Sequence, residues 1–292
     1  MIGYLIKPNI NQLLLTQTKS TTITKAQKDT TMSEQQFMQR PLTLDDAQAI
    51  ADTINAISAH EGTHRNYHAD TLVLEWSEPE MDITQSSTAM TTPDGKIVAY
   101  MILRDNNVTP VRTWVQWGIH PDYLQHKLNE ILFTWLESRQ QNLIERCPAD
   151  ARIVLQCGVL SGYEPEEQTL NQTGFQKFRN SYQMRIDMDT KPPTPQFPEG
   201  ISARAYNPDT DIEGLVTAFR NSFSDHFGYV EEPFEKDVEE FRHWFATDKL
   251  FDPQYVVLAV DDASGVVAGY AIGMKEEHGD PSVSHIELLG VS

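Results

Sequence analysis

Two histidines and a glutamate stand at a spacing that can bind zinc. His60-Glu61-Gly62-Thr63-His64 has the form H-E-x-x-H. On a continuous helix, His60 and His64 would share a face and bind the metal, while Glu61 would activate a bound water. This pattern is typical of zinc hydrolases. Because Gly62 weakens the helix and no third ligand follows in a known pattern, we favour a solvated, histidine-rich helix end and expect no metal.

A second group of charged residues is a cluster of acids in the C-terminal half. Six acidic residues are close together in the sequence, namely Glu231, Glu232, Glu235, Asp237, Glu239 and Glu240. Such a run is most simply the solvated face of a helix. Its functional alternative is to attract a cationic acceptor such as an amine.

Composition narrows the classes of partner. The chain has 292 residues, with 23 Lys and Arg against 42 Asp and Glu, and a formal net charge of -19. This balance argues against general binding to nucleic acid or to anionic lipid. No apolar run approaches the roughly 20 residues of a membrane span. Cys147 and Cys157 cannot form a disulfide framework, and they fit a reducing, cytoplasmic location.

A proline-rich stretch divides the chain. Four prolines occur in residues 189–199, which we interpret as a stiff linker between domains. Residues 1–38 are rich in Thr, Gln and Lys, and we expect them to be a disordered tail. The remaining chain then forms a first domain, 39–188, and a second one, 200–292.

The pattern of apolar residues predicts an α/β fold in both domains. Helical spacing after Asp45 is followed by predicted strands at about 84–91, 97–103 and 111–119. A strong helix is expected from Pro121 to Leu136, because its leucines recur on one face. The later elements of this domain are a buried strand at 153–157, a helix near 164–172 and strands running to Met188.

The second domain repeats the first half of this order. Two amphipathic helices near 212–223 and 234–245 precede strands at about 254–261, 266–274 and 283–291. Short strings also recur in the same order: Arg40-Pro41 as Arg204-Ala205, Gly95-Lys96-Ile97-Val98-Ala99-Tyr100 as Gly265-Val266-Val267-Ala268-Gly269-Tyr270, and Gly118-Ile119 as Gly290-Val291. A duplicated domain explains this ordered recurrence. By this comparison, the second copy contains about two-thirds of a domain.

This order of elements, the repeated hairpin string and Gly174-Phe175 near the end of the first copy resemble the GNAT superfamily of acyl-CoA-dependent N-acyltransferases. Two copies in one chain are similar to mycothiol synthase-like tandem proteins. The resemblance implies acetyl-CoA as cosubstrate and a small-molecule primary amine as acceptor. The rival interpretation from another class is a non-catalytic ligand-binding or scaffold protein.

The resemblance also implies site residues in the second copy. His285–Val291 would be the strand whose backbone binds the pantetheine arm, with Leu289, Gly290 and Val291 at the cofactor. Glu287 matches the family's catalytic base, and His226 lies where relatives contact the acceptor. An amine with a pKa near 10 must lose a proton before it can attack a thioester, which is why a base is needed.

The first copy departs from the family pattern. Val115 stands at the position of Glu287, and Leu170 replaces a tyrosine that many relatives use to protonate the leaving thiolate. The phosphate-binding loop is expected to have the form Arg/Gln-x-x-Gly-x-Gly/Ala, yet residues 124–129 contain no glycine. We therefore expect a degenerate first domain, with catalysis in the second.

Overall fold

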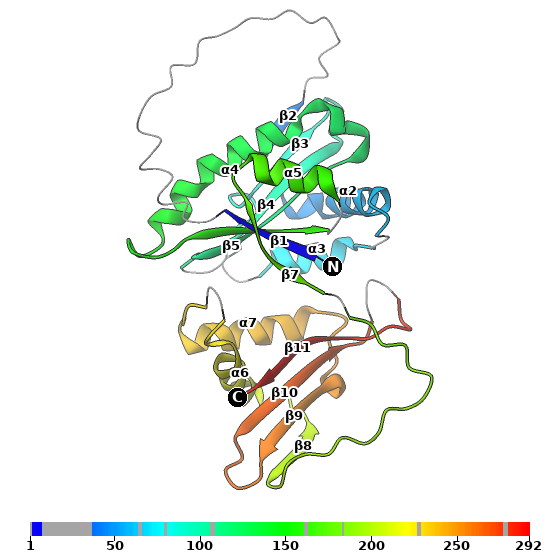
Figure 1. Cartoon of the computed structure of the whole chain (residues 1–292), viewed down its shortest axis with the longest axis vertical. Helices are drawn as coiled ribbons and strands as arrows, with labels where there is room; N and C mark the ends of the chain where they lie inside the picture. Colours follow the sequence, from blue (N-terminus) through cyan, green and yellow to red (C-terminus); the bar gives the residue numbers. More distant parts are fainter. Residues whose placement is uncertain are drawn as a thin grey trace, which may run out of the picture. The chain divides into compact units, whose positions relative to one another are not determined.

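The chain folds into two compact units, which are described separately (Figure 1). The computed structural model describes residues 2–7, 37–63, 66–78, 81–105, 109–160, 163–182, 184–226, 229–276 and 280–292. The first unit comprises Met1–Trp76 and Glu80–Gln183, and the second comprises Ser77–Pro79 and Met184–Ser292. In the described part of the chain, no helix is long and apolar enough to cross a membrane.

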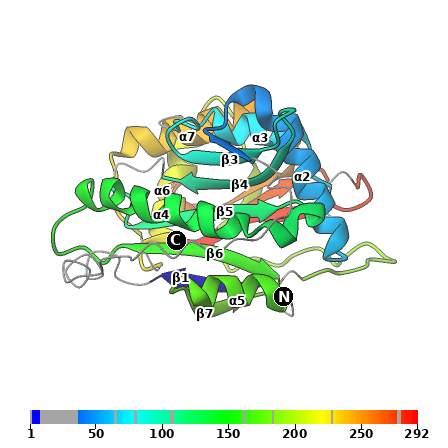
Figure 2. The same cartoon turned by 90° about the horizontal axis from the view of Figure 1, so that it is seen from above.

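A seven-stranded sheet forms the centre of the first unit, in the order β2-β3-β4-β5-β6-β1-β7 (Figure 2). The strands are β1 (Ile2–Lys7), β2 (Met38–Arg40), β3 (Ser87–Thr91), β4 (Ile97–Arg104), β5 (Arg112–Ile119), β6 (Val154–Leu160) and β7 (Gln176–Ser181). Neighbours pair antiparallel except β5 and β6, which are parallel. This parallel pair is where the site described below opens.

Helices cover both faces of this sheet. The helices of the unit are α2 (Ala47–His60), α3 (Ala69–Trp76), α4 (Leu128–Glu145) and α5 (Glu164–Gln172), with short 3₁₀ turns η1 (Leu44–Asp46) and η2 (Pro121–His126). On one face, α2 and α3 pack over Tyr100 and Ile102. On the other face, α4 and α5 bury Leu132, Leu170 and their neighbours against the odd-numbered residues of β5 and β6. The sheet thus separates two apolar cores.

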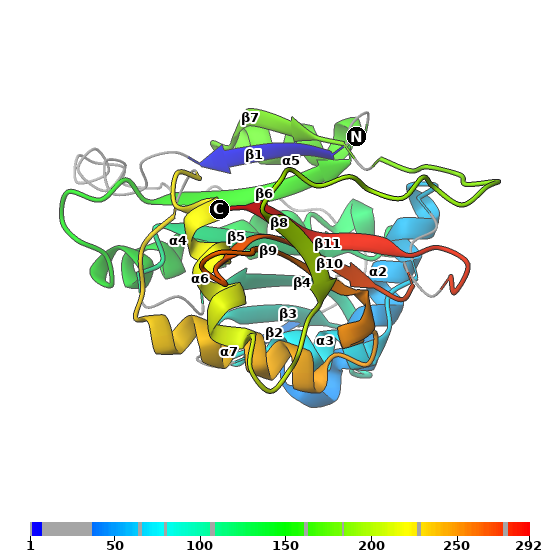
Figure 3. The same ribbon diagram turned by 90° about the horizontal axis from the view of Figure 1, so that it is seen from below.

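The second unit has a four-stranded antiparallel sheet in the order β11-β10-β9-β8 (Figure 3). Its elements are β8 (Ile201–Ala205), α6 (Ile212–Phe223), α7 (Phe234–Thr247), η3 (Pro253–Tyr255), β9 (Val256–Asp261), β10 (Val267–Met274) and β11 (His285–Val291). Helices α6 and α7 pack on one face of the sheet, around Leu215, Phe241 and Leu258. Both predicted helices and all three predicted strands of this copy are present.

The N-terminal residues 2–7 were expected in a disordered tail, and this expectation is wrong. They form β1, which pairs antiparallel with β6 on one side and with β7 on the other. Apolar and aromatic residues in Ile2-Gly3-Tyr4-Leu5-Ile6 favour a strand. Its partners are more than a hundred residues away in sequence, so local composition could not reveal them. The rest of the predicted tail up to residue 36 lies outside the described residues.

Strand β7 is shorter than predicted. It ends at Ser181, whereas alternation of residue types predicted a strand running to Met188. Met184, Ile186 and Met188 are all more than two-thirds exposed. The described residues from 184 to 200 contain no helix or strand, in keeping with the expected proline-rich linker.

Each unit contains the same kind of ion pair just before its first long helix. In the first unit, the Arg40 guanidinium donates to both carboxylate oxygens of Asp46 at 2.7 and 2.8 Å. In the second unit, Arg204 donates in the same two-pronged way to Asp211. Each aspartate also accepts the backbone N–H that opens the turn, from Thr43 or from Asn207. The duplication seen in sequence is therefore also a duplication of contacts.

A tyrosine packed on a glycine is the second shared feature. Tyr100 stands opposite Gly118 across β4 and β5, and Tyr270 stands opposite Gly290 across β10 and β11. A Cβ atom added to Gly118 would lie 2.5 Å from Ile57 Cδ1 and 3.0 Å from Tyr100 Cε1. At Gly290, it would lie 2.5 Å from Tyr270 Cε1. Both positions therefore lack room for a side chain, which explains why each is a glycine.

We expect Gly118→Ala to lower the free energy of unfolding by about 1–3 kcal/mol, because the new methyl group overlaps Ile57. Urea denaturation would measure the loss. Ile57→Val removes the overlapping Cδ1 atom, so the double variant should be less destabilised than the sum of the single variants. Simple additivity would contradict this packing.

Acid should reduce the contribution of these two Arg–Asp ion pairs to the stability of the fold. The hydrogen bond from Arg40 lowers the pKa of Asp46, and Arg204 does the same for Asp211. A carboxyl with a lowered folded-state pKa stabilises the fold above its unfolded value near pH 4, and this contribution is lost as pH falls further. Asp46→Asn should therefore lower the urea midpoint at pH 7, with a smaller difference from wild type at pH 3. If the urea midpoint of Asp46→Asn at pH 7 equals that of wild type, the ion pair does not stabilise the fold.

Candidate functional site

Strands β5 and β6 of the first unit pair over a short distance and then separate. Their parallel register joins Arg112 to Val154, Thr113 to Leu155 and Trp114 to Gln156, and ends there. Residues 115–119 of β5 continue alongside β4 alone. The backbone N–H of His120 donates to the carbonyl of Val98 and so points towards β4. Along β5, the backbone groups of successive residues point alternately towards β4 and away from it. By that alternation, the backbone groups of Trp117 and Ile119 face the opening.

A cavity of about 300 Å³ lies at this opening. Residues of α2 and of its C-terminal end, of β5 and β6, and of the first turn of α5 line it. Its walls combine aromatic, hydroxyl and carboxylate side chains with the backbone of β6, and the lining residues are Ile54, Ile57, Ser58, Glu61, Thr63, Tyr67, Trp114, Gln116, Trp117, Gly158, Val159, Leu160 and Glu166. The cavity therefore has a mixed wall of apolar, aromatic and polar side chains, and two carboxylates line its acidic end.

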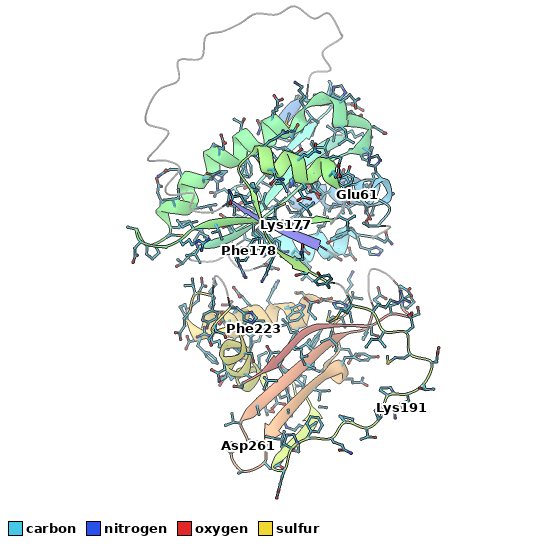
Figure 4. All side chains as sticks on the ribbon, in the orientation of Figure 1. Glu61, Lys177, Phe178, Lys191, Phe223 and Asp261 are labelled. Carbon is cyan, nitrogen blue, oxygen red and sulfur yellow. The ribbon has the colours of Figure 1, made fainter. Side chains whose placement is uncertain are left out.

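Two glutamates from different helices meet at the acidic end. Glu61 caps the C-terminus of α2, where Figure 4 labels it, and Glu166 belongs to α5. Burial, as the larger cause, and the negative charge of Glu61 together raise the pKa of Glu166 to about 8. The same two carboxylates raise the pKa of Tyr163, after burial as the main cause. At neutral pH, Glu166 is consequently mostly protonated.

Burial and local charge keep the neighbouring groups neutral. Burial is the main cause that raises the pKa of Tyr100 and of the Cys157 thiol far above the physiological range, and Glu166 adds to both shifts. Among the described groups around Glu166 whose pKa is shifted, Glu166 itself is thus the one with a pKa closest to neutral pH. Glu166 is not evident as a site residue from the sequence, because on a short acidic helix it resembles its solvated neighbours.

The loop before α4 contains an unexpected backbone conformation. A continuous helix from Pro121 to Leu136 was predicted, and this is wrong: η2 ends at His126 and α4 begins at Leu128. Between them, Lys127 has φ 52°, in the left-handed region that favours glycine. Leu124, expected on the buried face, is 47% exposed. Lys127 therefore holds a backbone conformation that glycine adopts without strain.

In the second unit, the predicted site residues lie on an edge strand. Strand β11 pairs with β10 alone among the described strands, and Glu287 is skipped in the register, since Gly273 faces Ile286 and Ile272 faces Leu288. This makes Glu287 the extra residue of a β-bulge. Its Oε2 atom lies 2.7 Å from Nε2 of His285, and its side chain is 47% exposed.

The three predicted cofactor residues follow the bulge. Leu289 and Val291 are exposed, whereas Gly290 is buried beneath Tyr270. Ser292 donates its N–H to the carbonyl of Ala268, and alternation from this bond places the backbone groups of Leu289 and Val291 on the outer edge. These positions match Trp117 and Ile119 of the first unit.

His226 lies just beyond α6. It is exposed, and its ring stands edge-on to Phe223 with a centroid distance of 4.4 Å. Phe223 is labelled at the end of α6 in Figure 4. The described contacts of His226 are thus with Phe223 and, through the backbone, with Tyr229.

The zinc motif does not lie on one continuous helix. His60 is the last residue of α2, and Gly62 follows with φ 72°, which ends the helical path. His64 lies outside the described residues. Among the residues that the structure does describe, no group of three His, Cys, Asp or Glu side chains is placed to hold a metal ion.

Comparison with known proteins identifies relatives for this arrangement. No family model matches the chain. Mycothiol acetyltransferase of Salinispora arenicola is 26% identical over 125 residues, which cover 40% of this chain and 37% of the relative. The Salinispora tropica enzyme of the same name is 25% identical over 124 residues. The matched region thus spans little more than a third of these curated relatives.

Solved structures match over most of the chain. A GCN5-related N-acetyltransferase from Sphaerobacter thermophilus has a TM-score of 0.67 and 25% identity, and the match covers 89% of this chain and 77% of that one. A tandem GNAT protein from the clavulanic acid biosynthesis pathway has a TM-score of 0.57 and 16% identity, with 88% and 79% covered. The class is therefore the α/β GNAT fold in tandem. The chain is thus similar in fold to tandem GNAT N-acetyltransferases, as its sequence predicted.

Replacing the left-handed lysine tests the loop conformation. Lys127→Gly should raise the free energy of unfolding by about 1 kcal/mol, because glycine adopts positive φ without strain. Lys127→Ala serves as the control, since it also removes the exposed 3.7 Å ion pair with Glu130 but keeps the strain. Chemical denaturation should show a gain for glycine alone. Equal stability of both variants would mean that φ at this position is not strained.

Proposed function

We propose that the chain is an acyl-CoA-dependent N-acyltransferase that transfers an acetyl group from acetyl-CoA to a primary amine. One observation supports this above others: in each unit, one strand has backbone groups along one edge that pair with no other described strand. These groups belong to Trp117 and Ile119 in β5 and to Leu289 and Val291 in β11. A pantetheine arm carries amides that can pair with such groups as an added strand does. The N-acetyltransferases among the relatives agree with this activity.

Within this proposal, catalysis belongs to the second unit, with Glu287 as the base. The bulge at Glu287 turns the strand locally, and such bulges commonly re-aim a side chain beside an active site. The exposed carboxylate can take a proton from an ammonium group directly or through water. Its contact with His285 holds it in place.

Leu289, Gly290 and Val291 are the proposed cofactor contacts. The outward backbone groups of Leu289 and Val291 would bind the pantetheine amides, while Gly290 allows β11 to pack on Tyr270. His226, which is exposed beyond α6, is the proposed contact for the acceptor. No metal has a role in this scheme.

The first unit supports a second candidate function, which is ligand binding without transfer. Its strands separate as an acyl-CoA site requires, yet Val115 occupies the position of Glu287 and is buried. A side chain without a titratable group cannot remove the proton. The first unit would then bind a ligand and leave the chemistry to the second.

Mutation of Glu287 tests the assignment. With acetyl-CoA and a simple primary amine such as tyramine, Glu287→Gln should lower the rate of thiol release about 10²–10⁴-fold, a range typical of a lost general base. Acetyl-CoA binding, measured by calorimetry, should change little. Glu239→Gln, an exposed glutamate on α7, is the matched control.

Two results would count against the proposal. Acetyl-CoA that releases no binding heat with the full chain would remove the acyltransferase function altogether. Wild-type turnover in Glu287→Gln would instead remove only its location in the second unit.

A further inference from the structure

We propose that the cavity of the first unit binds an organic cation, a primary ammonium group on an apolar or aromatic body, with the Glu166 carboxylate as its receptor. This goes beyond the proposed acyl transfer, because binding of the cation requires neither acyl-CoA nor Glu287. It also changes the prediction for the first unit, which would retain recognition of an amine.

The position of Glu166 on α5 explains why it points inward. Leu170 lies one helical turn later and is completely buried, and residues four apart share a helix face. Glu164, two residues earlier, is exposed. A carboxylate on the buried face of a helix is costly unless a partner compensates for its charge.

No such partner is seen for Glu166 in the part of the chain that the structure describes. The one charged group that shifts its pKa is Glu61, which has the same sign. The titratable groups facing it from other elements are Glu61 at the end of α2, Tyr163 before α5, Tyr100 on β4 and the Cys157 thiol on β6. A bound cation would compensate for the charge on Glu166 and ease the repulsion between the two carboxylates.

The remaining wall suits the body of such a ligand. Trp114, Trp117 and Tyr67 line the cavity, and aromatic faces attract cations as well as apolar groups. A volume of about 300 Å³ is at the lower end of the range for small-molecule sites. The acidic end and the aromatic wall together select for an amphipathic cation.

A buried amide beside the cavity is the independent observation. Gln156 is 1% exposed, and neither its Nε2 nor its Oε1 atom has a hydrogen-bond partner among the described residues. Because side chains alternate along β6, Gln156 lies on the same face as Gly158 and Leu160, which line the cavity. Buried amides are nearly always paired, so an unpaired one on this face of β6 indicates a missing polar partner.

Calorimetry with the full chain, in the absence of acetyl-CoA, tests the proposal. The probe is phenethylammonium chloride, and 2-phenylethanol is its uncharged counterpart. We expect the ammonium to bind at least tenfold more tightly than the alcohol. Because Glu166 is mostly protonated at pH 7, binding should release about 0.9 proton, which buffers of different ionisation enthalpy reveal. The affinity should rise about fiftyfold from pH 6 to pH 8 for a carboxyl with a pKa about 8.

Two variants make the result specific. Glu166→Gln keeps the size of the side chain, and it should abolish both the preference for the ammonium and the proton release. Glu164→Gln on the same helix should behave as wild type. Thermal unfolding checks that Glu166→Gln is folded. A carboxyl whose pKa is raised in the folded state destabilises the fold as pH rises towards that pKa. From pH 6 to pH 8, wild type should therefore lose more stability than Glu166→Gln, which lacks this carboxyl.

Each outcome has a definite meaning. Equal affinity for the ammonium and the alcohol, binding of neither probe at millimolar concentration, or unchanged proton release in Glu166→Gln would overturn the proposal. Failure of acetyl-CoA to bind, with the ammonium result intact, would overturn the acyltransferase proposal and leave this one standing.

Discussion

The separation of β5 from β6 after Trp114 is the constraint on which the site of the first unit depends. Backbone groups inside a protein need partners, so a strand that leaves its neighbour must expose its edge to solvent or to a ligand. Here the divergence opens the cavity and lets Glu166 approach from α5. Each face of the sheet packs against its own apolar core, and the polar cavity lies where β5 and β6 separate.

The contacts that support this opening are repeated in the second unit. In both units, an Arg–Asp pair closes the turn before the first helix, and a tyrosine packs on a glycine of the strand at the site. The duplicated contacts fix the first helix and that strand relative to each other. The two units differ in the residues that these shared contacts position. One has an exposed Glu287 in a β-bulge, and the other has Val115 at that position and the partly buried Glu166 nearby.

The two glutamates illustrate how position decides chemistry. Glu287 lies on an edge strand, half exposed and in contact with His285. Glu166 lies on the inner face of a short helix, where burial and Glu61 raise its pKa to about 8. Burial disfavours the charged form of a carboxylate, so Glu166 stays mostly protonated at neutral pH until a cation compensates for its charge. The first favours catalysis and the second favours recognition.

The sequence by itself determined the α/β class, the duplication and most helices and strands, because periodicity and turn residues act over a few neighbouring positions. It also identified Gly118 and Gly290 as matching positions. Tertiary structure alone decided that residues 2–7 form a strand, that Lys127 interrupts a predicted helix, and that Glu61 and Glu166 meet. Each of these depends on partners remote in sequence, since pairing, backbone strain and pKa values are set by the groups that folding brings together.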